Sequence, residues 1–130
     1  MRISSFDIGY VNRGLTMQSS RNERRTDLLR GTLDLLILQT LDLQPLHGLA
    51  IADRIRQVTR RAFSVPPGSL FPALHRLAQG GWIKGEWTVT GDGRRVKSYA
   101  LTAAGRRQLV AKQRKWARIV TAMAQVLESR

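Results

Sequence analysis

The sequence predicts a mainly α-helical protein with a small β-hairpin, arranged as a winged helix-turn-helix followed by one long C-terminal helix. Three observations predict this fold class. Three helical segments joined by short links precede a Gly-Asp-Gly turn that lies between two β-prone runs. A heptad-like spacing of apolar residues then continues to the C-terminus. Lys and Arg number 22 against 9 Asp and Glu, and the net charge of +13 indicates a polyanionic partner.

The length of 130 residues suits one domain with extensions. We expect a flexible basic N-terminal tail over residues 1–24, the winged helix-turn-helix over residues 25–102 and a C-terminal dimerisation helix over residues 103–130. The tail is rich in Arg, Ser, Asn and Gly and has no sustained periodicity. Its composition favours a disordered leader over the alternative, a basic arm that follows a DNA groove.

The first helix is expected over residues 26–43, and its apolar residues exceed one stripe. Leu35 and Leu38 lie off the face that the other apolar residues form. A helix that is apolar on two sides is usually buried on two sides, so we expect Leu35 and Leu38 to contact a partner subunit. The remaining face consists of Leu33, Leu36, Ile37 and Leu41.

A turn is predicted at residues 45–48, and a second helix follows it. Ile51, Ile55 and Val58 are expected to face inward, and the arginines of this helix largely outward. Residues 62–66 then lead to a third helix. Helix, turn, helix, short link and helix is the core of a helix-turn-helix protein.

The third helix has a clear division of faces. Four apolar residues at helical spacing form one buried stripe, and Gly80 and Gly81 end the helix. Ser69 is the expected N-cap, which places Pro72 in the first turn. The opposite face is expected to enter the major groove of DNA. It consists of Ser69, Phe71, Pro72, His75, Arg76 and Gln79.

Ser69 and Arg76 are the strongest candidates for direct base contacts on that face. Arginine can bind guanine O6 and N7 in bidentate fashion, which discriminates against other bases by about 1–3 kcal/mol. Phe71 is expected either to reach the DNA or to be half buried in the core. His75 is expected to contact phosphate or water.

Residues 82–90 and 94–101 are predicted to form a hairpin around the Gly-Asp-Gly turn. Arg94, Arg95 and Lys97 lie at its tip or just after it. A hairpin with a basic tip that directly follows such a helix is a wing. We expect these three cations to grip phosphates or to enter the minor groove. The alternative is an exposed hairpin with solubilising charges.

Thr102 is expected to cap a final helix that runs to about Leu127. A helix about 37 Å long cannot bury its apolar seam on so small a domain, so a homodimer is predicted. Trp116 lies in the middle of the seam, and dimerisation would bring two indoles near the two-fold axis. These indoles either fill the interface core or hold a small aromatic effector. The seam residues are Leu109, Gln113, Trp116, Val120, Met123 and Leu127.

Several classes of function are excluded or disfavoured. The chain has no cysteine, and its two histidines are far apart without a neighbouring acidic cluster, so no metal and no cofactor are expected. We find no catalytic constellation and expect no enzyme activity. No membrane span and no signal peptide are indicated, so the expected location is cytoplasmic. The competing function is a non-specific basic nucleic-acid-binding protein, architectural or ribosome-associated.

The chain resembles PadR-family transcriptional regulators of the short type with a single C-terminal helix. The resemblance covers residues 27–127. Six motifs in order carry it: GTLDLLIL at 31–38, LHGLAI at 46–51, GSLFPALHRL at 68–77, GWI at 81–83, RRVKSY at 94–99 and LTAAGR at 101–106. Leu49, Phe71 and Ser98 depart from the family pattern, which has aromatic residues at these positions.

The resemblance implies a homodimeric winged helix that binds double-stranded DNA. It implies that the C-terminal helix of one subunit packs against the N-terminal helix of the other. It further implies repression from operators with dyad symmetry, and release of DNA by a small aromatic compound in some relatives. The three departures remove aromatic rings or hydroxyls that could touch phosphate, so operator preference is expected to differ from that of typical members.

Overall fold

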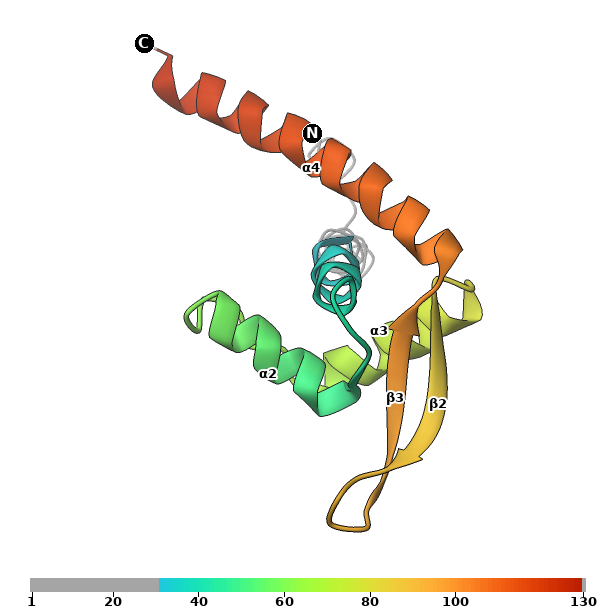
Figure 1. Ribbon diagram of the computed structural model, residues 1–130. Coiled ribbons are helices and arrows are strands. Elements are labelled where there is room, and N and C mark those ends of the chain that lie inside the picture. The colour runs from blue at the N-terminus through green and yellow to red at the C-terminus, as the bar shows by residue number, and fades with distance from the viewer. Residues whose placement is uncertain (1–30, 130) are drawn as a thin grey trace, which may run out of the picture. The chain divides into compact units, whose positions relative to one another are not determined.

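The computed structural model describes residues 31–129, so the tail expected over residues 1–24 lies outside the described residues. The predicted fold class is confirmed: within residues 31–129, four helices accompany a small antiparallel sheet (Figure 1). The elements in chain order are a helix over residues 31–41, β1 (Leu46–His47), α2 (Gly48–Val58), α3 (Pro67–Gln79), β2 (Ile83–Val89), β3 (Arg95–Leu101) and α4 (Ala103–Glu128).

One hydrophobic core joins the helices to the sheet. The largest contribution comes from α3, whose four predicted apolar residues are all buried. The spacing of these residues gives α3 one continuous inner face, so the opposite face is presented outward on a rigid support. The core consists of Ile37, Leu38, Leu41, Ile51, Ile55, Leu70, Ala73, Leu74, Leu77, Ile83, Tyr99 and Leu109.

The first helix differs from its prediction in two ways. It ends at residue 41 rather than 43, and the side chain of Leu43 is exposed. Leu38 is 0 % exposed within the single chain, so its predicted place at a dimer interface is wrong. Leu35 is half-buried and packs against the same core. Both apolar sides of the helix are therefore largely covered by the chain itself.

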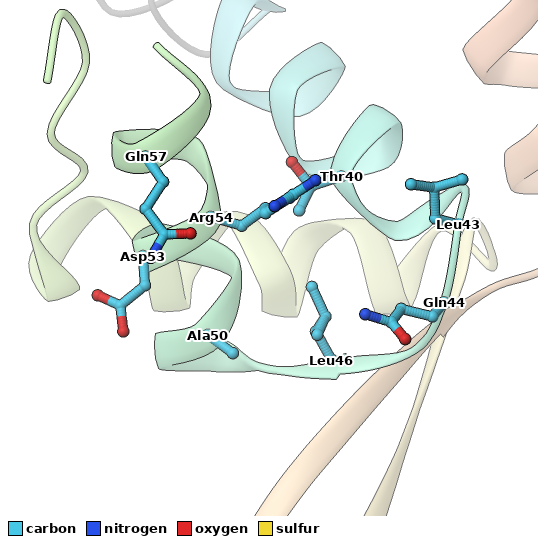
Figure 2. A pocket seen from close by; sticks show the side chains of 8 residues that line it. All are labelled: Thr40, Leu43, Gln44, Leu46, Ala50, Asp53, Arg54 and Gln57. Carbon is cyan, nitrogen blue, oxygen red and sulfur yellow. The ribbon is translucent and has the colours of Figure 1, made fainter. Parts of the chain in front are cut away.

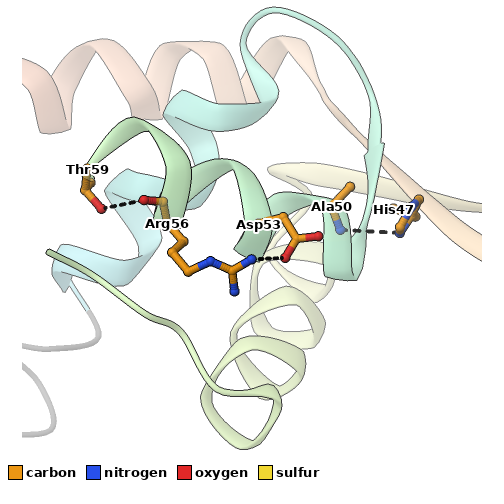
Figure 3. Close-up of polar contacts among 5 residues, drawn as sticks. All are labelled: His47, Ala50, Asp53, Arg56 and Thr59. Carbon is orange, nitrogen blue, oxygen red and sulfur yellow. Dashed lines mark hydrogen bonds and ion pairs between the residues drawn. The ribbon is translucent and has the colours of Figure 1, made fainter. Parts of the chain in front are cut away.

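The predicted turn at residues 45–48 contains a short strand that the sequence did not reveal. Leu46 pairs with Tyr99 and His47 with Ser98, which makes β1 the edge of a sheet with the order β1-β3-β2. Two residues are too few for an alternating pattern to be recognised. His47 also caps α2, because its Nδ1 accepts the N–H of Ala50 at 3.4 Å (Figure 3).

The second helix is confirmed at its inner face and corrected at its end. Ile51 and Ile55 are buried as predicted, but Val58 is 63 % exposed. Val58 is the last residue of α2, and the chain leaves the helix there instead of continuing over the core.

The start of α3 also differs from its prediction. The N-cap is Pro66, which makes no side-chain cap hydrogen bond, and the helix begins at Pro67. The assignment of Ser69 as N-cap is therefore wrong, because the proline at the first helical position already sets a helical φ. Pro72 lies inside the helix rather than in the first turn.

The end of α3 is confirmed at Gly80 and Gly81. Gly81 has a φ of 81°, and its N–H donates to the carbonyl of Ala78 at 3.0 Å. The N–H of Trp82 donates to the carbonyl of Leu77 at 3.1 Å. These two bonds define a Schellman motif with glycine in the left-handed position.

Thr102 fixes the start of α4, as predicted. Its hydroxyl donates to the carbonyl of Gly81 at 2.7 Å and accepts the N–H of Gly105 at 3.0 Å. Its own N–H donates to the carbonyl of Trp82 at 3.1 Å. A Cβ added to Gly105 would lie 1.9 Å from that same carbonyl oxygen, so only glycine allows α4 to approach the backbone this closely.

We expect Gly105→Ala to lower the free energy of unfolding by about 1–3 kcal/mol, because backbone atoms must move apart. This loss should occur although alanine favours the helix by roughly 1 kcal/mol. Urea denaturation measures the change. Gly91→Ala is the matched control, since nothing lies within 4 Å of its added Cβ. Equal stability of the two variants would contradict the close approach.

Candidate nucleic-acid interface

The outward face of α3 is a mixed polar and apolar surface. Ser69, Pro72, His75 and Gln79 are exposed, and the buried stripe behind them fixes the helix. The structure thus places four of the six predicted groove residues together on one accessible face. A helix with this exposure fits the major groove of B-DNA.

Phe71 lies at the border between this face and the core. A Cβ added to Gly48 would lie 2.8 Å from Cε1 of Phe71, so the ring rests on the first residue of α2. The residue is nevertheless 44 % exposed. Phe71 is therefore half packed, and the glycine at position 48 provides the space for its ring.

Arg76 does not point into the solvent with the other residues of this face. Its Nη2 lies 2.5 Å from Oδ1 of Asp34 on the first helix, and the Asp34 residue is only 7 % exposed. A buried carboxylate requires a partner of opposite charge, and Arg76 supplies it. In this structure Arg76 therefore contacts Asp34, and its assignment as a direct base contact stays a prediction.

The pairing of Arg76 with Asp34 lowers the free positive charge on the outward face of α3. Arg76 is the single Lys or Arg within α3, so its ion pair leaves the outward face of this helix without a free arginine or lysine. Binding to polyanionic DNA depends strongly on such cations. They must come from other elements.

The wing, which comprises β2, β3 and the turn between them, contains four cations: Lys84 lies on β2, and the other three lie at the turn or on β3. The turn lies beyond the helices in Figure 1. Arg94 is well exposed and lies 3.5 Å from the carboxylate of Asp92. The Thr90 hydroxyl donates to Asp92 and lowers the pKa of that carboxyl group. Arg95 and Lys97 follow on β3 and are also exposed.

Trp87 is a residue of the wing that the sequence analysis did not single out. It pairs with Lys97 in the strand register and is 59 % exposed. The guanidinium of Arg95 lies 4.7 Å from its ring centroid, and the ammonium of Lys97 lies 5.7 Å from it. The indole therefore holds two cations on one face of the hairpin. Strand alternation around the Asp-Gly turn could have revealed this cluster.

The predicted seam of α4 divides into two parts. Leu109 is buried in the core of its own chain, so its predicted place at a dimer interface is wrong. Gln113 bonds to Gln39 within the chain at 2.6 Å. The other four seam residues remain exposed in the single chain, with Trp116 at 45 %. They are Trp116, Val120, Met123 and Leu127.

A cavity of about 350 Å³ lies between the end of the first helix, β1 and α2. Figure 2 shows Arg54 directed toward Thr40 across this space, with Leu43 and Leu46 on the side of the connecting segment. Trp116 is not part of its lining. The predicted effector position on α4 and this cavity are therefore different places in the chain.

A helix-turn-helix with an accessible third helix and a basic wing defines a DNA-binding transcription regulator. The family model of the transcriptional regulator PadR-like family matches residues 37–111. The chain belongs to this family, whose members are regulators rather than enzymes. Within the part of the chain that the structure describes, no helix is both long and apolar enough to cross a membrane.

Three relatives illustrate the similarity. The transcriptional regulator Rv3488 of Mycobacterium tuberculosis is 34 % identical over 85 residues, which span 65 % of this chain and 76 % of the relative. A PadR family transcription regulator from Clostridium difficile is 31 % identical, with a TM-score of 0.65 over 72 % of this chain and 96 % of its own. A transcriptional regulator from Clostridium thermocellum is 25 % identical, with a TM-score of 0.69 over 76 % and 96 % of the two chains.

We expect Arg76→Ala to lower the free energy of unfolding by about 1–3 kcal/mol, because Asp34 loses its partner. Base preference should not change. Urea denaturation and binding to a set of operator variants measure the two effects. Arg114→Ala, an exposed arginine on α4, is the control. A stable Arg76→Ala protein with relaxed base preference would instead show that Arg76 contacts bases in the major groove.

Proposed function

We propose that this protein is a sequence-specific repressor that binds a dyad-symmetric operator as a homodimer. The observation that carries this proposal is the combination, on one chain, of an accessible α3 face and a basic wing. The α3 face would supply base contacts in the major groove through Ser69, Phe71, Pro72, His75 and Gln79. The wing would supply contacts to the phosphate backbone.

The exposed part of the α4 seam supports the dimer. Four large apolar residues recur along one side of a helix about 39 Å long, beyond the part that Leu109 anchors. A contiguous exposed apolar stripe of this kind usually marks a protein interface. Two-fold pairing through α4 would place two copies of α3 on one face of DNA, as a palindromic operator requires.

We further propose a small planar aromatic effector at Trp116. The half-exposed indole lies on the stripe that would pair with a second copy, so two indoles would approach each other near the two-fold axis. A flat compound could stack between them and change the separation of the two α3 helices. Release of DNA then requires that the compound bind the released state more tightly than the DNA-bound state.

Removing wing cations should weaken binding to every duplex. Arg94→Ala combined with Arg95→Ala removes two phosphate contacts per subunit, or four per dimer. The slope of log K against log salt is negative, and its magnitude should therefore decrease by about 3.6. Fluorescence anisotropy over a salt series measures it, on a duplex carrying the inverted repeat upstream of the gene and on a scrambled duplex. A change in sequence preference with an unchanged slope would refute this role of the wing.

Charges on the α4 stripe should dissociate the dimer. Val120→Glu combined with Met123→Glu places carboxylates where apolar contact is proposed and leaves the buried Leu109 untouched. Sedimentation velocity should then give the 14.7 kDa monomer. Arg118→Glu lies on the opposite side of the helix and should leave the dimer intact. A double variant that still sediments as a dimer would exclude this interface.

The effector proposal predicts coupled quenching and release. A Trp82→Phe, Trp87→Phe background isolates the fluorescence of Trp116, and planar aromatic compounds that do not intercalate into DNA are titrated against it. A binding compound should quench Trp116 in this background and lower operator affinity in the wild-type chain. Trp116→Ala in the wild-type chain should abolish the effect of the compound on operator affinity. Absence of quenching, or quenching without a change in operator affinity, would leave Trp116 with a purely structural role.

A further inference from the structure

The turn that follows α2 contains two consecutive arginines in the left-handed backbone region. Arg60 has a φ of 53° and Arg61 a φ of 69°. Among the described residues they are the two non-glycine positions with positive φ. This backbone conformation is unfavourable for residues other than glycine. We call Arg60 and Arg61 the arginine turn.

The hydrogen bonds of the arginine turn show that glycine would suit this backbone better. The N–H of Arg61 donates to the carbonyl of Arg56 at 2.8 Å, and the N–H of Arg60 donates to the carbonyl of Gln57 at 3.1 Å. This is the same Schellman motif that ends α3, where glycine occupies the left-handed position with a φ of 81°. The arginines are therefore not explained by the requirements of the turn.

The side chains of the arginine turn also make no polar contact with other residues in the described part of the chain. Both are exposed, and no ion pair or side-chain hydrogen bond joins either of them to another residue in 31–129. The neighbouring Arg56 differs, because its Nη2 lies 3.0 Å from Oδ1 of Asp53 (Figure 3). Strain retained at exposed, unpartnered residues indicates a functional role of the side chains.

The distribution of charge over the proposed DNA-binding interface is consistent with a role of these side chains in binding phosphate. The outward face of α3 has no free arginine or lysine, since Arg76 is paired with Asp34. Along the chain, the wing follows the C-terminal end of α3, and residues 62–66 join the arginine turn to its N-terminal end. In helix-turn-helix proteins the N-terminal residues of the recognition helix contact the base edges. Residues just before that end therefore approach the backbone that borders the groove.

We propose that the arginine turn is a second phosphate-binding site, which binds the DNA backbone near the N-terminal end of α3. The ligand is the phosphodiester backbone, without base preference. The proposal rests on the proposed function, because it requires α3 to enter the groove. It adds Arg60 and Arg61 to the phosphate contacts that the wing would make.

The test replaces both arginines by glycine, which relieves the strain and removes the charges together. Arg60→Gly combined with Arg61→Gly should raise or maintain the melting temperature. The magnitude of the negative slope of log K against log salt should decrease by about 3.6 for a dimer, or about 1.8 for a single bound subunit. Affinity at low salt should fall at least tenfold, equally on the operator duplex and on a scrambled duplex. Anisotropy over a salt series and thermal melting give both readouts.

Two further variants make the outcome specific. Arg60→Lys combined with Arg61→Lys keeps the charges and the strain and should keep the slope. Arg114→Ala combined with Arg118→Ala removes two charges from α4 and should leave the slope close to that of wild type. A glycine variant with unchanged slope, or one whose affinity falls without a change of slope, would overturn the proposal. Wild-type protein that binds operator and scrambled duplexes equally would instead refute sequence-specific repression, while the slope comparison would still decide the role of the arginine turn.

Discussion

The ion pair between Asp34 and Arg76 determines how charge is distributed over the proposed DNA-binding surface. A largely buried carboxylate on the first helix needs a counter-charge, and the single strong cation of α3 provides it. The pair therefore ties α3 to the first helix and removes arginine from the outward face of α3. Any grip on phosphates must come from elements beside α3.

The first helix contacts both α3, which is proposed to bind DNA, and α4, which is proposed to pair with a second subunit. Asp34 contacts α3, and Asp42 and Gln39 contact Arg106 and Gln113 of α4. These contacts form a continuous physical link between the apolar stripe of α4 and the face of α3.

The cations beside α3 are held in two different ways. On the wing, the indole of Trp87 stacks against Arg95 and Lys97, so an aromatic ring positions charge without neutralising it. At the end of α2, a left-handed backbone projects Arg60 and Arg61 from a turn in which the same chain elsewhere uses glycine. Both arrangements leave the charged groups accessible to a polyanion.

The sequence by itself determined the order of the helices, the hairpin, the buried stripe of α3 and the cap at Thr102, because periodicity and turn chemistry are local properties. It could not determine β1, since two residues carry no pattern, nor the partner of Arg76, since Asp34 is distant in the chain. Burial of Leu38 and Leu109 likewise depended on which surfaces meet. Tertiary structure decided these points, because burial and ion pairing depend on neighbours that only folding brings together.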